Sequence, residues 1–340
     1  MKSIDVFCHL MPPEYAKICM AEAPHKSHMF MRALNVASMS DMTRRLEVLK
    51  QFPGYKQIPN IVSPPVETFA EPEKSPRLAA IGNDEIKTIV DANPDYYEGF
   101  IAGIPFNNIK ASVDEIKRVK DMGAKGIQIY THMNGEAIDT EKYWPIYEIC
   151  EKLSLPILIH PVGGQMVPEF PKESRSKYEL WFTIGWPYQT TVAMMRLAYS
   201  GIFEDFPHIK IITHHVGAMI PMLEGRIENG LKLYGSRTPA DLRESLTKTK
   251  MKGAPIDTIR KFYADTASFG SVSAIQAGLS FFGKSHLVFA TDMPFDPEQG
   301  PGYISRTLNC IDQLALSEAD KAAILHGNAE HLFHLNKEAD

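Results

Sequence analysis

The chain has 340 residues, of which 44% are hydrophobic and 23% charged, and its formal net charge is −5. These values are typical of a globular protein, and the acidic balance argues against nonspecific nucleic-acid binding, which needs a basic face. No window approaches 18 consecutive apolar residues, so we expect no membrane span. The N-terminus lacks the basic start and apolar run of a signal peptide, so we expect a cytoplasmic protein.

Short apolar runs bounded by Pro or Gly alternate along the chain with segments of helical periodicity. Such runs predict buried strands, here over residues 4–8, 58–62, 100–104, 126–130, 155–160, 209–215, 262–266 and 287–292. The helical segments span residues 40–51, 84–92, 112–122, 143–153, 189–200, 219–233, 271–283, 304–314 and 318–335. Eight strands alternating with helices predict a single (β/α)8 TIM barrel over residues 1–340, without a second core or a linker.

Two long insertions interrupt this pattern, after the first and the fifth predicted strands. Residues 12–39 are rich in Met and poor in periodicity, which favours a lid or an oligomer contact. Residues 161–187 contain Trp181 and Trp186, an aromatic density suited to closing a pocket. The apolar area of both insertions predicts a homo-oligomer, with a dimer the first expectation.

The four cysteines are scattered without the CxxC spacing of a metal or redox motif. They are Cys8, Cys19, Cys150 and Cys310. We expect reduced thiols that pack in the core.

Four predicted strands end in histidine or aspartate, at His9, His160, the pair His214–His215 and Asp292. In α/β barrels the C-terminal ends of the strands carry the chemistry. Imidazole and carboxylate groups together suit Zn²⁺, Mn²⁺ or Fe²⁺. The pattern therefore predicts a mononuclear metal site on a barrel.

Side chains alternate along a strand, so Asp5, Phe7 and His9 should share one face while Val6 and Cys8 share the other. If His9 points into the barrel mouth, Phe7 does so too. Cys8 is therefore a poor candidate for a metal ligand.

The set of strand ends resembles the amidohydrolase superfamily, in particular the branch of aminocarboxymuconate-semialdehyde decarboxylase and the hydroxybenzoate decarboxylases. The matching segments are distributed over nearly the whole chain, at residues 4–13, 158–164, 201–207, 211–221, 290–294 and 327–329. The resemblance implies one divalent metal ion, Zn²⁺ first and Mn²⁺ second, and a small carboxylate as substrate.

The resemblance also implies roles for particular residues. His9, His160 and Asp292 would bind the metal, and Asp292 would be the proton donor as in the aromatic subclass. His215 would be the catalytic histidine, because it lies six residues before Pro221, as the family's does. His214 would then pack on the other face of the strand.

Phe7 departs from the family pattern, which opens with His-x-His or Glu-x-His. Phenylalanine cannot bind a metal, so one protein ligand is lost. Three interpretations follow. The metal binds through His9, His160 and Asp292 with water and substrate oxygens completing the set, or the site binds metal weakly, or the protein has lost its metal.

Arg44 and Arg45 lie in the predicted helix over residues 40–51. The corresponding helix of the relatives supplies an arginine that reaches a substrate carboxylate. We expect a solvated helix face for both residues here, with substrate binding as the second interpretation.

Three functions are compatible with these residues. The first is a metal-dependent, non-oxidative decarboxylase of a small hydroxylated aromatic or unsaturated carboxylate. The second is a metal-dependent hydrolase or hydratase of an amide, lactone or C=C substrate, with His215 as general base. The third is a catalytically silent, ligand-binding barrel, which Phe7 alone supports.

Overall fold

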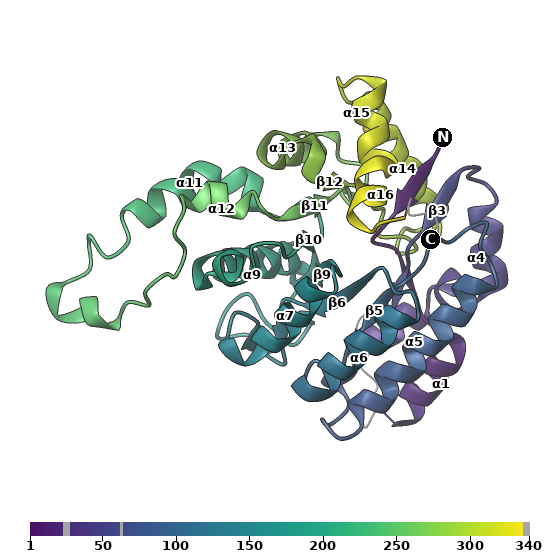
Figure 1. Cartoon of the computed structure of the whole chain (residues 1–340), viewed down its shortest axis with the longest axis horizontal. Coiled ribbons are helices and arrows are strands. Elements are labelled where there is room, and N and C mark those ends of the chain that lie inside the picture. Colours follow the sequence, from purple (N-terminus) through teal and green to yellow (C-terminus); the bar gives the residue numbers. More distant parts are fainter. Residues whose placement is uncertain (23–27, 62–63, 336–340) are drawn as a thin grey trace.

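The computed structural model describes residues 1–22, 28–61 and 64–335, and its centre is a parallel sheet of eight short strands (Figure 1). In spatial order these are β2 (His9–Leu10), β4 (Asn60–Ile61), β5 (Ile101–Gly103), β6 (Gly126–Tyr130), β9 (Ile157–His160), β10 (Ile211–Thr213), β11 (Tyr263–Asp265) and β12 (Leu287–Val288). A separate parallel pair joins β1 (Ser3–Asp5) to β3 (Tyr55–Gln57).

Backbone hydrogen bonds connect the two edges of this sheet. The amide of Val6 donates to the carbonyl of Phe289 at 3.0 Å, and the amide of His9 donates to the carbonyl of Met293 at 2.9 Å. The amide of Asp292 donates to the carbonyl of Phe7 at 3.0 Å. The fold is thus a mixed α/β structure around a curled parallel sheet, consistent with the predicted TIM barrel.

The longer helices lie around the outside of the sheet (Figure 1). They are α4 (Met42–Leu49), α5 (Ser75–Asp91), α6 (Ile109–Asp121), α7 (Trp144–Lys152), α9 (Gly185–Ser200), α11 (Ile220–Lys232), α13 (Val272–Phe282) and α14 (Pro301–Gln313). Shorter elements are α10 (Ile202–Asp205), α12 (Pro255–Ile259), α15 (Glu318–Ala322), a π-turn (Ala323–Gly327), α16 (Asn328–Leu332) and the hairpin of β7 (His132–Met133) and β8 (Glu136–Ala137).

Alternation along the strands separates two of the three core clusters of the described residues. The interior cluster of the sheet takes one side chain from each of several strands and is covered by the end of the chain; its members include Ile4, Phe7, Ile58, Ile101, Leu158, Ile212, Val288, Leu332 and Phe333. Ile157 and Ile159, the neighbours of Leu158, belong instead to the cluster between sheet and helices, as does Cys8. The predicted placement of Phe7 inside and Cys8 outside is therefore confirmed. The predicted placement of Val6 beside Cys8 is wrong, because residues 6 and 7 form a bend between β1 and β2 and Val6 joins the interior cluster.

The Met-rich segment 12–39 differs from the predicted loop, because it is mostly helical. It contains α1 (Pro13–Glu22), α2 (His28–Leu34) and α3 (Ala37–Ser40), while residues 23–27 lie outside the described residues. Tyr15 and Cys19 of α1 pack in one cluster with Leu78 of α5. Tertiary packing thus stabilises helices that the local periodicity is too weak to predict.

A third excursion, which the sequence patterns did not single out, runs from residue 233 to residue 254. It includes a 3₁₀ segment (Ala240–Ser245) and extends away from the body of the molecule between α11 and α12 (Figure 1). All four cysteines lie in the described part of the chain, where each is buried and unpaired, as expected for packing residues. Among the described residues, no helix has both the length and the apolar character needed to cross a membrane.

Arg45 contradicts the expectation of a solvated helix face, because its side chain is fully buried. Its guanidinium donates to the backbone carbonyl of His9 at 2.6 Å and to Oε1 of Gln57 at 2.6 Å. Arg44, the preceding residue on α4, has a side chain that is 65% exposed. Arg45 therefore fixes the backbone at the start of β2 through its hydrogen bond to the His9 carbonyl.

Replacing Arg45 with methionine should lower the free energy of unfolding by about 2–4 kcal/mol, because the His9 carbonyl and the Gln57 amide oxygen would be left buried without donors. The matched control is Arg44→Met, which should change stability by less than about 0.5 kcal/mol. Urea unfolding of both variants measures the difference. Equal stability of the two variants would contradict a structural role for Arg45.

Candidate active site

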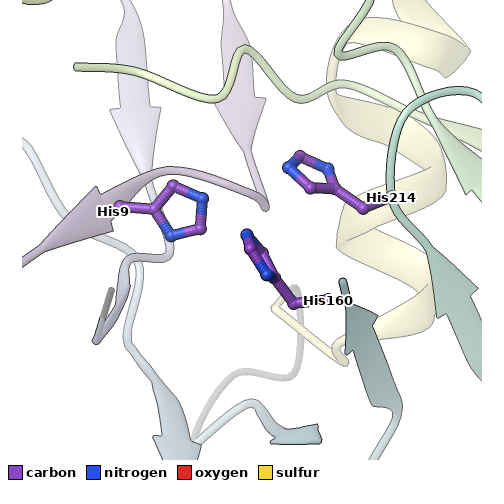
Figure 2. Close-up of side chains that lie close together, drawn as sticks. All are labelled: His9, His160 and His214. Carbon is purple, nitrogen blue, oxygen red and sulfur yellow. The ribbon is translucent and has the colours of Figure 1, made fainter. Parts of the chain in front are cut away.

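Histidine and aspartate side chains from three separate parts of the sheet converge at the C-terminal ends of the strands. Nε2 of His9 lies 2.9 Å from Oδ1 of Asp292, and Nε2 of His214 lies 3.4 Å from the same oxygen. One ring nitrogen from each of His9, His160 and His214 lies within 4.8 Å of the others (Figure 2). All four side chains are nearly or fully buried.

The alternation of the strands explains why these residues meet. His160 follows the interior residue Leu158 by two positions, and His214 follows the interior residue Ile212 in the same way. Side chains two residues apart point to the same face. His214 therefore faces the interior, and the expectation that it packs on the other face of the strand was wrong.

His215 reaches the site by a different route. The backbone is left-handed at His215 and Val216, with φ of 59° and 61°, so the chain turns sharply after β10. The His215 ring stacks on that of His214 at 3.8 Å between centroids, and its Nε2 lies 3.7 Å from Oδ2 of Asp292. Its side chain is 11% exposed, and it lines a cavity.

Hydrogen bonds fix the protonation of two of the imidazoles. Nδ1 of His160 donates to the carbonyl of Pro161 at 2.5 Å, and Nδ1 of His214 donates to Oδ2 of Asp265. In each ring Nε2 is then the nitrogen that can bind a metal ion once its proton has left. Asp265, the last residue of β11, was not singled out from the sequence.

The cluster perturbs the titration of its members. Burial lowers the pKa of His160 well below its usual value, and it also lowers the pKa of His215. Burial opposes the charged form of His214, but the carboxylates of Asp265 and Asp292 outweigh it and raise its pKa to about 9. Burial likewise opposes ionisation of Asp292, yet hydrogen bonding to the surrounding histidines holds its pKa well below the usual range.

The residues fit a divalent metal ion. Among the described residues, Nδ1 of His9 and Nδ1 of His215 are buried without a hydrogen-bond partner, and Nε2 of His9 and Nε2 of His214 both face one oxygen of Asp292. Buried polar atoms without partners are rare and call for an explanation, and a bound cation is one. Imidazole nitrogens beside a carboxylate are the ligand types that Zn²⁺ and Mn²⁺ accept.

Phe7 lies inside this group of rings, as its alternation with His9 predicts. Its ring stacks on His214 at 4.0 Å between centroids with 15° between the planes, and it lies 6.2 Å from the ring of His9 and 6.1 Å from that of His160. It is fully buried. The position where the family resemblance led us to expect a metal ligand is thus occupied by an apolar ring.

A cavity of about 420 Å³ opens beside the cluster and is mainly aromatic. Its lining includes Trp181, Phe182, Trp186, Phe269, Phe295, Tyr303, His215 and Asp292. The volume and the apolar lining with a few polar groups suit a small aromatic ligand. The predicted role of the 161–187 insertion in closing a pocket is thereby supported.

The two insertions meet over this cavity. Arg32 of α2 donates to both carboxylate oxygens of Glu179 at 2.8 Å and 3.0 Å. Its guanidinium lies 5.5 Å from the ring centre of Trp181, in the short α8 region (Leu180–Thr183). Arg32 also lines the cavity, so it is placed to contact a ligand, although no sequence pattern indicated it.

The family model described as Amidohydrolase matches residues 62–335. Among curated proteins, the chain is 29% identical to a 2-amino-3-carboxymuconate-6-semialdehyde decarboxylase of Dictyostelium discoideum over 77% of this chain and 67% of that protein. It is 27% identical to a gamma-resorcylate decarboxylase of Polaromonas over 86% and 87%, and 26% identical to a 6-methylsalicylic acid decarboxylase of Penicillium expansum over 98% and 96%.

Solved structures share the fold over the whole chain. A dihydroxybenzoic acid decarboxylase of Polaromonas, determined with manganese and the inhibitor 2-nitroresorcinol, superposes with a TM-score of 0.78 at 24% identity, covering 99% of this chain and 98% of that one. A 5-carboxyvanillate decarboxylase of Sphingomonas paucimobilis gives a TM-score of 0.80 at 22% identity, covering 98% and 99%.

Replacing Phe7 with histidine should raise the metal affinity, because the new imidazole would add one more possible ligand to the cluster of histidines and Asp292. The volume change is small, so the fold should tolerate it. Isothermal titration of Mn²⁺ into metal-free wild type and Phe7→His measures the effect, with Phe7→Leu as the control that removes the ring without adding a ligand. Unchanged affinity in the histidine variant would contradict the orientation described for residue 7.

Proposed function

The chain belongs to the amidohydrolase family, and on that premise we propose that it is a metal-dependent, non-oxidative decarboxylase of a small hydroxylated aromatic carboxylate. The observation that carries the proposal is the junction of the buried His/Asp cluster with an aromatic cavity, which Asp292 and His215 both line. The three curated relatives reported above are decarboxylases, two of them of gamma-resorcylate and 6-methylsalicylic acid. We also infer one domain, a closed (β/α)8 barrel with long insertions after its first and fifth strands.

His9, His160 and Asp292 would hold the metal, for which Zn²⁺ and Mn²⁺ are the first candidates. When bound, the ion would supply Lewis-acid polarisation and a template for the substrate's carboxylate and neighbouring oxygen. The aromatic walls of the cavity would stack on the substrate ring and keep water out.

Decarboxylation requires a proton at the ring carbon that carries the carboxylate. The proton adds to that carbon, the bond to the carboxylate breaks, and its electron pair returns to the ring as CO₂ leaves. Oδ1 of Asp292 faces His9 and His214, whereas Oδ2 faces His215 at 3.7 Å. Asp292 and His215 are therefore placed to move a proton between the cluster and the cavity.

The other two hypotheses receive less support. A hydrolase or hydratase would use the same residues, but the relatives reported above include no such enzyme. A silent binding barrel has no need of buried imidazole nitrogens without partners, which are costly to retain.

The protein should release CO₂ from one or more members of a hydroxybenzoate panel. His160→Ala and Asp292→Ala should abolish this activity without unfolding the protein, because residues at the active face contribute more to chemistry than to stability. His215→Ala should lower kcat by about 10²–10⁴-fold. The control is His286→Ala at the opposite end of the sheet, where His286 stacks on Tyr263, and it should keep the activity.

If the metal-loaded wild type releases CO₂ from no member of the panel, the proposed decarboxylase activity is contradicted. Loss of folded, soluble protein in both alanine variants would instead assign structural roles to His160 and Asp292.

We propose a homodimer in the cytoplasm. Several large apolar side chains of the second insertion are exposed, among them Met166, Val167, Phe170, Tyr178 and Ile184. Exposed apolar area of this extent within one segment is typical of an interaction surface. Light scattering at micromolar concentration should give the mass of a dimer, and Phe170→Asp combined with Tyr178→Asp should shift it toward the monomer. A monomer in the wild type would contradict this proposal.

A further inference from the structure

The ligand set His9, His160 and Asp292 supplies three protein groups, because Phe7 has no lone pair to offer. A buried ion held by three groups leaves the fourth side of the cluster to be filled. In the structure that side is occupied by His214, which neither the spacing of the sequence nor the family resemblance assigns to the metal.

His214 lies at a distance suited to a shared ion. Its Nε2 is 3.4 Å from Oδ1 of Asp292, and its ligand nitrogen is within 4.8 Å of those of His9 and His160. Two ligands of a tetrahedral ion with bonds of 2.0–2.1 Å are separated by about 3.3 Å. The rings of His9, His160 and His214 point toward one common space (Figure 2).

The surroundings of His214 fix its ring in the orientation of a ligand. Nδ1 donates to Oδ2 of Asp265, whose Oδ1 accepts from the amides of Val216 and Ala267 at 3.0 Å each. A carboxylate behind Nδ1 is the usual support of a metal-bound histidine, because it fixes the tautomer and makes the other nitrogen more basic. Phe7 stacks on the ring and prevents it from tilting.

His215 lacks these features. Among the described residues its Nδ1 has no hydrogen-bond partner, so no carboxylate fixes its tautomer as Asp265 does for His214. Its Nε2 lies 3.7 Å from Oδ2 of Asp292, and its ring lines the cavity. The left-handed backbone at residues 215 and 216 turns it away from the interior row. Of the two successive histidines, His214 therefore lies in the cluster with His9 and His160, and His215 lies at the wall of the cavity.

We propose that His214 is a metal ligand of this protein, that it compensates for the ligand lost at Phe7, and that Asp265 is its positioning residue, while His215 remains available to the substrate. This inference rests on the proposed metal dependence and deepens it. The metal would then have four protein ligands, three imidazoles and one carboxylate. Phe7 would bind no metal itself but would hold the ring of His214 in place by stacking on it.

The test is the metal affinity of the purified, metal-free protein, measured by titration with Zn²⁺ and Mn²⁺ without any substrate. Asp265→Asn should weaken binding by about 10–100-fold, and His214→Ala by at least as much. His215→Ala is the matched control and should keep wild-type affinity. Wild-type affinity in His214→Ala, or an equal loss in His215→Ala, would overturn the proposal.

A second variant separates loss of a ligand from loss of the fold. Phe7→His introduced into His214→Ala should restore much of the affinity, because the new imidazole takes over the missing contact. No restoration, with both proteins folded by circular dichroism, would count against the proposal.

The crystal structure of the zinc-loaded wild type tests the same point without any variant. It should place Nε2 of His214 at about 2.0–2.1 Å from the ion, and a distance beyond 3 Å would overturn the proposal.

Failure of the inference and failure of the proposed function give different results. Wild-type protein that binds neither metal contradicts the proposed metal dependence itself. Wild-type protein that binds metal while His214→Ala binds it equally well contradicts only the role of His214.

Discussion

Asp292 is the carboxylate on which the site depends, because histidines from distant parts of the chain surround it. A buried carboxylate is costly unless it is paired and hydrogen-bonded. Here His9 and His214 approach one oxygen and His215 approaches the other. Since these residues come from both ends and the middle of the sequence, the cluster can form only when the curled sheet brings the first and last strands together.

The support of the cluster extends beyond the residues that contact it. Arg45 donates a hydrogen bond to the carbonyl of His9. Oδ2 of Asp265 accepts from Nδ1 of His214, while Oδ1 of Asp265 accepts from the backbone amides of Val216 and Ala267. Such contacts fix the ring orientations before any ligand binds. The cavity then lies on one side of a rigid cluster, with the two insertions joined above it by Arg32 and Glu179.

Strand alternation is what made much of this structure predictable from the sequence. The strand over residues 126–130 is observed with the predicted bounds, and Phe7, His9 and Cys8 lie on the predicted faces. The same rule, counted from Ile212, would have placed His214 inside. The spacing to Pro221 pointed to His215 instead. A left-handed backbone at residues 215 and 216 changes the direction of the His215 side chain, and neither residue is a glycine, so the sequence does not indicate this turn.

Other features depend on tertiary contacts that no local pattern encodes. Arg45 follows an exposed arginine on the same helix, and only its tertiary contacts with His9 and Gln57 distinguish the buried arginine from the exposed one. The helices of residues 12–39 form because α5 offers an apolar partner surface. Glu179 and Arg32 are separated by 147 positions in the chain, so their contact over the cavity could not be read from sequence spacing.

The proposed decarboxylation depends on one metal ion in this cluster. The most direct measurement follows CO₂ release from the substrate that the panel identifies while Mn²⁺ or Zn²⁺ is added stepwise to metal-free protein. We expect no release before addition, a linear rise, and a plateau at one equivalent of metal per chain. Full activity in the chelated, metal-free protein would contradict the proposed metal dependence.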